Sequence, residues 1–144
     1  MNKSSSNILL GFDFGTKHIG IAVGQTITKT ARALTSIKAI AGIPEWPVLD
    51  SLVKTWQPEA FIVGIPLNMD GTEQPLTQLA KKFSDLLRER YKIPVYDMDE
   101  RLTTVAAKEQ LFTKGGYRAL RKDKIDSQAA QLILQGWLKQ QDEL

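Results

Sequence analysis

Hydrophobic residues in this chain fall into short runs that alternate between strand and helix periodicity. Residues 8–23 (ILLGFDFGTKHIGIAV) hold two apolar runs on either side of FGTKH, which predicts two strands joined by a glycine-containing turn. The first run is almost entirely apolar, as is typical of a central strand buried on both faces. Asp13 stands at its end, and strand alternation places its side chain on the face opposite Phe12 and Phe14.

An aspartate on a buried strand needs compensation, because an unpaired charge there costs several kcal/mol or is neutralised by a shifted pKa. Gly11 and Gly15 share the face of Asp13 and leave space for a compensating group to approach. The alternative interpretation is that Asp13 begins a tight turn and accepts hydrogen bonds from nearby N–H groups. The hairpin alone favours neither interpretation.

The rest of the chain alternates short apolar runs with amphipathic stretches. The predicted strands cover residues 30–37, 59–65 and 93–98, and the predicted helices begin near Pro47, after an N-cap at Thr72, at Thr103 or Thr104, and near Lys124. Residues 41–47 are expected to form a loop. This order predicts an α/β fold with a mixed β-sheet and helices on both faces. Residues 1–144 are expected to form one domain, with a flexible tail over residues 1–7.

Composition narrows the possible chemistry. The 144 residues include no cysteine and one histidine, which excludes disulfides, thiolate catalysis and multi-histidine metal sites. Any bound metal would be a hard cation held by carboxylates. The polar N-terminus and the lack of an apolar run of about 20 residues lead us to expect a cytoplasmic protein without a membrane partner. The net charge of +3 is compatible with an anionic partner.

Acidic residues gather at the end of the predicted strand over residues 93–98. Asp97, Asp99 and Glu100 follow one another closely, and like charges at this spacing repel unless solvent or a cation separates them. Functional groups in open α/β sheets collect beyond the carboxyl ends of the strands. The simpler alternative is that these acids cap the following helix.

The last predicted helix carries an acid on its apolar face. Asp126 begins a stripe that continues through Ala129 and Ala130, two small residues that allow close approach to a sheet. A capping role suits Asp123 better than Asp126, because of the face that Asp126 occupies. If Asp126 met Asp13 and a strand-end acid, the three carboxylates could hold Mg²⁺ or Mn²⁺ and activate water for phosphodiester hydrolysis.

Residues 114–126 are rich in basic side chains and contain Gly115-Gly116 without clear periodicity. Five basic residues stand against two aspartates, which gives a local charge of +3. The basic residues are Lys114, Arg118, Arg121, Lys122 and Lys124. We expect a mobile loop that contacts a phosphate backbone.

Four stretches resemble, in order and spacing, the YqgF (RuvX-like) family: FDFGTKHIGIAVG, VGIPLNMDGTEQ, DERLTT and KIDSQAAQLIL. The resemblance covers residues 8–138. It implies a ribonuclease H-like fold related to the RuvC Holliday junction resolvases. Members of the family are described as resolvases and as nucleases that mature the 5′ end of precursor 16S ribosomal RNA.

The resemblance also implies roles for individual residues. It places three acids, which hold Mg²⁺ or Mn²⁺, in the catalytic and metal site: Asp13, Glu100 and Asp126. Position and charge, rather than the resemblance, indicate the expected substrate-binding residues beside these acids and in the basic segment: Lys17, Arg101, Arg121 and Lys122. The alternative for Lys17 and Arg101 is that they only neutralise the neighbouring carboxylates.

The expected function is therefore that of a metal-dependent nuclease in precursor 16S rRNA maturation, acting on RNA or on ribosomal precursor particles as a monomer or weak dimer. Holliday junction resolution and non-catalytic RNA binding are the alternatives. The string DFGT also resembles a phosphate motif of actin-like sugar kinases and chaperone ATPases, but those proteins need a second lobe that 144 residues cannot supply. GFDFGTK has three residues between its glycines, whereas a P-loop has four.

Overall fold

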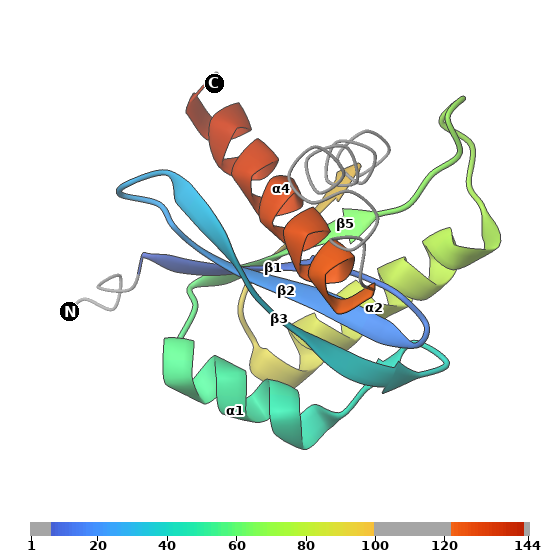
Figure 1. Cartoon of the computed structure of the whole chain (residues 1–144), viewed down its shortest axis with the longest axis horizontal. Coiled ribbons are helices and arrows are strands. Elements are labelled where there is room, and N and C mark those ends of the chain that lie inside the picture. Colours follow the sequence, from blue (N-terminus) through green and yellow to red (C-terminus); the bar gives the residue numbers. More distant parts are fainter. Residues whose placement is uncertain (1–6, 100–121, 143–144) are drawn as a thin grey trace.

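The computed structural model describes residues 7–99 and 122–142, with side chains in the last helix described for residues 127–141 (Figure 1). The described elements are β1 (Ile8–Asp13), β2 (His18–Gln25), β3 (Thr30–Ile40), β4 (Ile43–Pro44), α1 (Trp46–Trp56), β5 (Ala60–Ile65), α2 (Pro75–Tyr91), β6 (Val95–Asp99) and α4 (Lys122–Asp142). Within this part of the chain, no helix is long and apolar enough to cross a membrane.

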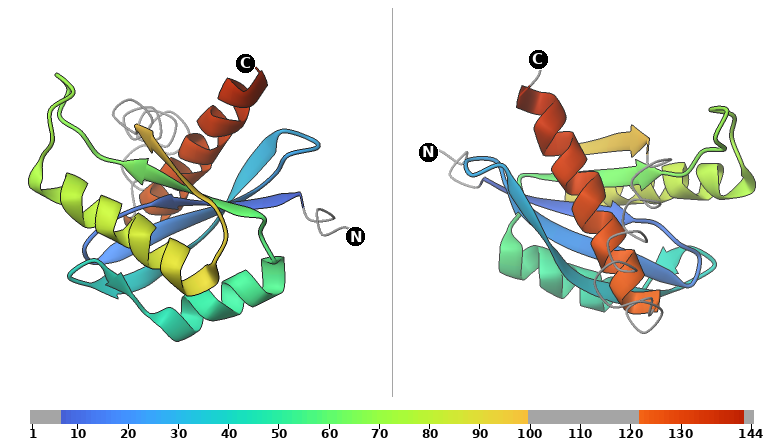
Figure 2. Two further views of the ribbon diagram at one scale, coloured as in Figure 1. Left: turned by 180° about the vertical axis from the view of Figure 1, so that it is seen from behind. Right: turned by 45° about the horizontal axis from the view of Figure 1, so that its top comes forward.

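The strands form a mixed sheet in the order β4-β3-β2-β1-β5-β6. β1 pairs antiparallel with β2 and parallel with β5, so it joins the antiparallel and parallel halves of the sheet. Helices α1 and α2 cover one face, and α4 crosses the other (Figure 2). This arrangement confirms the predicted mixed sheet with helices on both faces, and it explains why the sequence of β1 is nearly all apolar.

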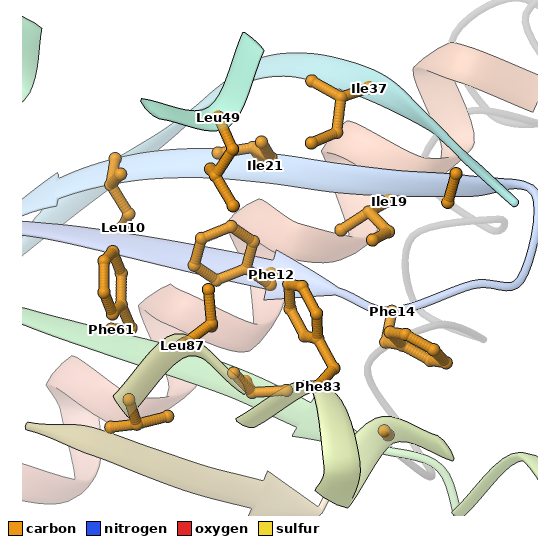
Figure 3. Packing of buried hydrophobic residues seen from close by; sticks show 14 of the residues in the cluster. Leu10, Phe12, Phe14, Ile19, Ile21, Ile37, Leu49, Phe61, Phe83 and Leu87 are labelled. Carbon is orange, nitrogen blue, oxygen red and sulfur yellow. The ribbon is translucent and has the colours of Figure 1, made fainter. Parts of the chain in front are cut away.

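The larger core lies between the sheet and helices α1 and α2. Phe12 is fully buried at its centre, and its ring meets those of Phe61 and Phe83 edge-on at centroid distances of 5.5 and 5.4 Å (Figure 3). Such pairs contribute about 0.5–1.5 kcal/mol beyond the burial of their area. Leu10 and Phe14 belong to the same core, so the predicted face of β1 is confirmed.

A smaller core lies between the sheet and α4. Leu9 and Ile62 of the sheet pack there with Ala130, Ile133 and Leu134 of the helix. The apolar stripe predicted for the last helix is therefore confirmed over its described side chains.

The N-cap predicted for the second helix at Thr72 is wrong. Asp70 Oδ1 accepts hydrogen bonds from Thr72 N at 3.0 Å and from Thr72 Oγ1 at 2.6 Å, so Thr72 closes the preceding turn instead. Gln74 is the N-cap, its backbone N–H donates to Thr77 Oγ1 at 3.0 Å, and the helix begins at Pro75. Thr72 therefore belongs to a local turn, although a simple capping rule assigns it to the helix.

Other predicted boundaries move as well. The strand predicted to end at residue 37 continues to Ile40 and turns back through β4, inside the predicted loop over residues 41–47. The last helix begins at Lys122, so the final residues of the predicted basic loop are helical. The helix predicted near Thr103 or Thr104 and residues 114–121 of that loop lie outside the described residues.

A polar contact fixes α1 against α2. Arg90 donates two hydrogen bonds to the Asp50 carboxylate, at 2.9 and 2.7 Å, and the Tyr91 hydroxyl donates a third at 2.6 Å. The Arg90 guanidinium also lies 4.5 Å from the ring centroid of Trp46. The Arg90 and then the Tyr91 hydrogen bonds lower the pKa of Asp50 from 3.8 to about 2.

This contact predicts an acid-dependent contribution to stability. The folded-state pKa of Asp50 is depressed, so its contribution is present above pH 3.8 and is lost as the pH falls through about 2. We expect the melting temperature of the Asp50→Asn variant to lie below that of the wild type at pH 5, and the difference to shrink towards pH 2. Thermal melts across this range measure it. A difference that stays constant with pH would contradict the assignment.

Candidate active site

Asp13 ends β1 on the face of the sheet that α4 covers. Its two cross-strand neighbours are Gly20 of β2 and Gly64 of β5. Neither neighbour has a side chain, so the half-buried carboxylate is flanked by backbone alone within the sheet. Three adjacent strands thus give one acid an uncrowded position, which suits a group that must accept a cation and its water ligands.

The turn after Asp13 is held in place by backbone contacts. The carbonyls of Thr16 and Lys17 accept hydrogen bonds from Gly42 N at 3.0 Å and Ala39 N at 2.8 Å. A Cβ atom at Gly15 would collide with the backbone oxygen of His18, so this position requires glycine. The exposed side chain of Lys17 is therefore presented from a fixed turn.

Helix α4 begins at the end of the sheet that carries this turn and runs back over the sheet away from it. Gln135 Nε2 donates to the Lys29 carbonyl at 2.9 Å, and Gln131 Nε2 donates to the Ala31 carbonyl at 3.0 Å. Strand β3 is parallel to β1. Moving along the chain from Lys29 to Ala31 therefore corresponds to moving from Gln135 to Gln131, which is towards the N-terminus of α4. The helix starts over the end of the sheet at which β1 ends (Figure 1).

The backbone of α4 brings position 126 towards Asp13. A Cβ atom at Gly11 would lie 3.3 Å from the carbonyl oxygen of Ala130. Asp13 is two residues further along β1, roughly 6.6 Å, and Asp126 is one turn earlier in α4, roughly 6 Å. Both steps lead to the same end of the sheet. The side chain of Asp126 lies outside the described residues.

Two of the strand-end acids lie on the other face of the sheet. Asp97 and Asp99 pair with Val63 and Ile65, whose side chains belong to the core under α1 and α2. Asp97 Oδ1 accepts a hydrogen bond of 2.8 Å from Ser84 Oγ of α2. Asp97 and Asp99 therefore face away from Asp13.

Of the remaining predicted site residues beyond Asp126, the structure describes only the backbone of one. Lys122 lies in the first turn of α4, where only the backbone is described. Glu100, Arg101 and Arg121 lie outside the described residues. In the described part of the chain, no three His, Cys, Asp or Glu side chains come close enough to hold a metal ion. The predicted cluster of Asp13, Glu100 and Asp126 thus stays a prediction, with one carboxylate described.

Sequence analysis missed three residues around Asp13. Gly20 and Gly64 interrupt apolar strand runs, IGIAV and IVGI, and a glycine inside a strand often marks a close approach. That signal was available. His18, two residues from Gly20 and on the same face, has a buried Nδ1 without a hydrogen-bond partner in the described structure. Its position depends on strand register, which the sequence alone does not reveal.

The model of one protein family matches nearly the whole chain. This is RuvX, described as a Holliday junction resolvase, and it matches residues 7–140. The chain belongs to the RuvX family. A relative from Actinobacillus pleuropneumoniae serotype 7 is 59% identical over 133 residues, which are 92% of this chain and 97% of the relative. One from Escherichia coli O1:K1 is 56% identical over 135 residues, 94% and 98% of the two chains. Both are named "Putative pre-16S rRNA nuclease".

Solved structures of resolvases share the fold of this RuvX protein. Thermus thermophilus RuvC, in complex with a Holliday junction, has a TM-score of 0.57 at 19% identity, covering 94% of this chain and 96% of that one. The fowlpox virus resolvase, with its junction DNA, has a TM-score of 0.53 at 12% identity, covering 93% and 98%. At these identities the likeness concerns the fold alone, and it confirms the expected ribonuclease H-like class.

Proposed function

We propose that this RuvX protein is a metal-dependent nuclease that hydrolyses phosphodiester bonds in the 5′-end maturation of precursor 16S rRNA. The observation that carries the proposal is Asp13, a half-buried carboxylate at the end of the central strand, flanked by two glycines beneath the start of α4. The names of relatives at 56–59% identity favour RNA as the substrate. The proposed partners are ribosomal precursor particles in the cytoplasm. The protein is proposed to bind them as a single-domain monomer or weak dimer.

Three carboxylates are proposed to hold the cation. Asp13 supplies oxygen ligands of the kind that Mg²⁺ and Mn²⁺ prefer. If the alternation of β6 continues for one residue beyond Asp99, Glu100 is expected on the face of Asp13. Asp126 is the third proposed ligand, from the first turns of α4. When bound, such a cation would supply a stronger nucleophile from water and stabilise charge on the leaving oxygen.

The chain's own residues then hold and orient the reacting groups. Asp13, on a strand fixed at both edges, is expected to position the water for in-line attack on phosphorus. The water oxygen forms the new P–O bond, the bond to the ester oxygen breaks, and that oxygen leaves with a proton. Basic side chains are proposed to contact the flanking phosphates: Lys17, Arg101, Arg121 and Lys122.

The deciding experiment compares two substrates with one purified protein. A precursor 16S RNA and a four-way DNA junction are each incubated with the protein in Mg²⁺ and in EDTA. We expect RNA cleavage near the 5′ end in Mg²⁺ alone. Cleavage of the junction in preference to the RNA would establish the resolvase alternative. RNA binding without cleavage under any divalent cation would establish the RNA-binding alternative.

Lys17 gives a sharper prediction about substrate contact. Its side chain is exposed on a turn that backbone hydrogen bonds fix, so its loss should not disturb the fold. We expect Lys17→Met to lower the cleavage rate about tenfold at an unchanged melting temperature. Lys54→Met, which removes an exposed lysine of α1, is the matched control and should cleave normally. Equal effects of the two substitutions would show that Lys17 contributes only through the overall positive charge and not through a substrate contact.

A further inference from the structure

A cavity lies at the end of the sheet opposite Asp13. It has a volume of about 340 Å³, within the range of small-ligand sites. Its lining includes Ile8, the first residue of β1, and Trp56, the last residue of α1. The six-residue β1 separates this cavity from Asp13 by roughly 17 Å, and the two lie on opposite faces of the sheet.

The cavity has one aromatic wall and one cationic side chain. The Arg32 guanidinium lies 5.4 Å from the ring centroid of Trp56. Ile8 and Val23, both on the α1 face of the sheet, provide an apolar surface, and Gln25 and Thr30 add polar groups. No acidic side chain lines the cavity in the described structure, so its charge favours an anionic ligand.

A comparison with the other arginine–tryptophan pair shows what is unusual here. Arg90 stacks on Trp46, but its guanidinium is also neutralised by the bidentate contact with Asp50. That pair therefore joins two helices and has a structural role. Arg32 is exposed and makes no ion pair within the described part of the chain. Arg32 and Trp56 both line the cavity instead.

We propose that this cavity binds a nucleobase and the adjoining phosphate of single-stranded RNA. A planar base stacks on indole and guanidinium surfaces, and arginine adds attraction for the phosphate. Gln25 Oε1 already accepts a hydrogen bond of 3.2 Å from Thr28, which leaves the Gln25 amide N–H groups to donate to acceptors on the base edge. The proposal rests on the proposed function and adds a contact for unpaired substrate nucleotides away from the cleavage site.

Short oligonucleotides test the proposal without cleavage. Hexamers of uridine and of adenosine are titrated in EDTA while tryptophan fluorescence is recorded, with an abasic hexamer of equal charge as the comparison. We expect quenching by the two base-containing hexamers and weaker binding of the abasic one. Trp56→Ala removes the reporting indole, so its binding is measured by titration calorimetry, and it should weaken base-containing hexamers roughly 5- to 150-fold. Arg32→Gln should also weaken their binding about tenfold. Arg32 is exposed and the core stays intact, so the melting temperature of this variant should be unchanged.

Lys54→Gln is the matched control for Arg32→Gln, because it removes one exposed charge from α1 outside the cavity. It should change binding less than twofold. Equal effects of the two substitutions, or equal binding of the abasic hexamer, would overturn the proposed base site. Absence of hexamer binding with intact Mg²⁺-dependent cleavage of precursor RNA would overturn this site alone. Normal hexamer binding without any cleavage would instead overturn the proposed function.

Discussion

Asp13→Asn is expected to abolish cleavage and leave the fold intact. The substitution keeps the shape of the side chain but removes the negative charge that a divalent cation requires. Cation-assisted stabilisation of the transition state is worth several kcal/mol, so the cleavage rate should fall on the order of 10²-fold or more. Single-turnover cleavage of precursor RNA in Mg²⁺ measures the effect.

Thermal melts of the same variant give a second readout. If Asp13, Glu100 and Asp126 form one site, mutual repulsion without a cation destabilises the wild type, and Asp13→Asn should be at least as stable. Added Mg²⁺ should raise the melting temperature of the wild type by mass action, and that of the variant much less. If Asp13 were only a turn-capping residue, Asn would replace it with little effect, and Mg²⁺ would shift neither protein.

Asp97→Asn is the matched control for this experiment. It makes the same chemical change on β6, but Asp97 faces α2 and accepts the Ser84 hydrogen bond on the side of the sheet away from Asp13. The control should therefore retain both cleavage and the Mg²⁺-dependent shift in melting temperature. Full cleavage by Asp13→Asn would falsify the metal-site hypothesis.

The sequence predicted those features of the site that follow from periodicity. Strand alternation separates Asp13 from Phe12 and Phe14 whatever the neighbouring strands are, and the structure places the two phenylalanines in the core under α1 and α2. Helical spacing likewise predicted that Ala129 and Ala130 face the sheet, and both are fully buried. In each case the rule acts within a single element.

The features that sequence analysis missed depend on pairing between elements. Alternation indicates that Asp97 and Asp99 share a face, but only the register with β5 shows that this face is opposite Asp13. Gly20 and Gly64 become neighbours of Asp13 through the same kind of register. The cavity beside Trp56 is likewise formed by residues from separate elements, and no local pattern indicates which of them meet.

The boundaries of helices and strands were mispredicted for a different reason. Several local conformations compete for the same residues there. Thr72 suits a helix N-cap and a turn equally well by composition, and the Asp70 side chain decides in favour of the turn. Residues 41–47 contain glycine and prolines and were predicted to form a loop. Ala41 and Gly42 both adopt positive φ angles, which turn the chain tightly enough for Ile43 and Pro44 to pair with the end of β3.

Gly11→Ala is expected to destabilise the protein and to reduce cleavage further than stability alone would require. Its Cβ atom would lie 2.9 Å from Leu134 Cβ and 3.3 Å from the Ala130 carbonyl oxygen, so α4 must move away from β1. Overpacking of this kind costs about 1–3 kcal/mol, or roughly 3–12 °C in melting temperature. Because α4 also carries Asp126, its displacement should slow cleavage at temperatures where the variant is fully folded.

Two further variants isolate the contact between β1 and α4. Gly136→Ala is the matched control: its Cβ atom would lie 2.8 Å from Met98 Cε, the end of a flexible side chain that can rotate away. It should be neutral or stabilising by up to about 1 kcal/mol, because alanine favours the helix. Leu134→Gly removes the Cβ atom that Gly11→Ala would meet, so the two changes combined should cost less than the sum of the two single changes. Additive losses would show that Gly11 does not set the distance between β1 and α4.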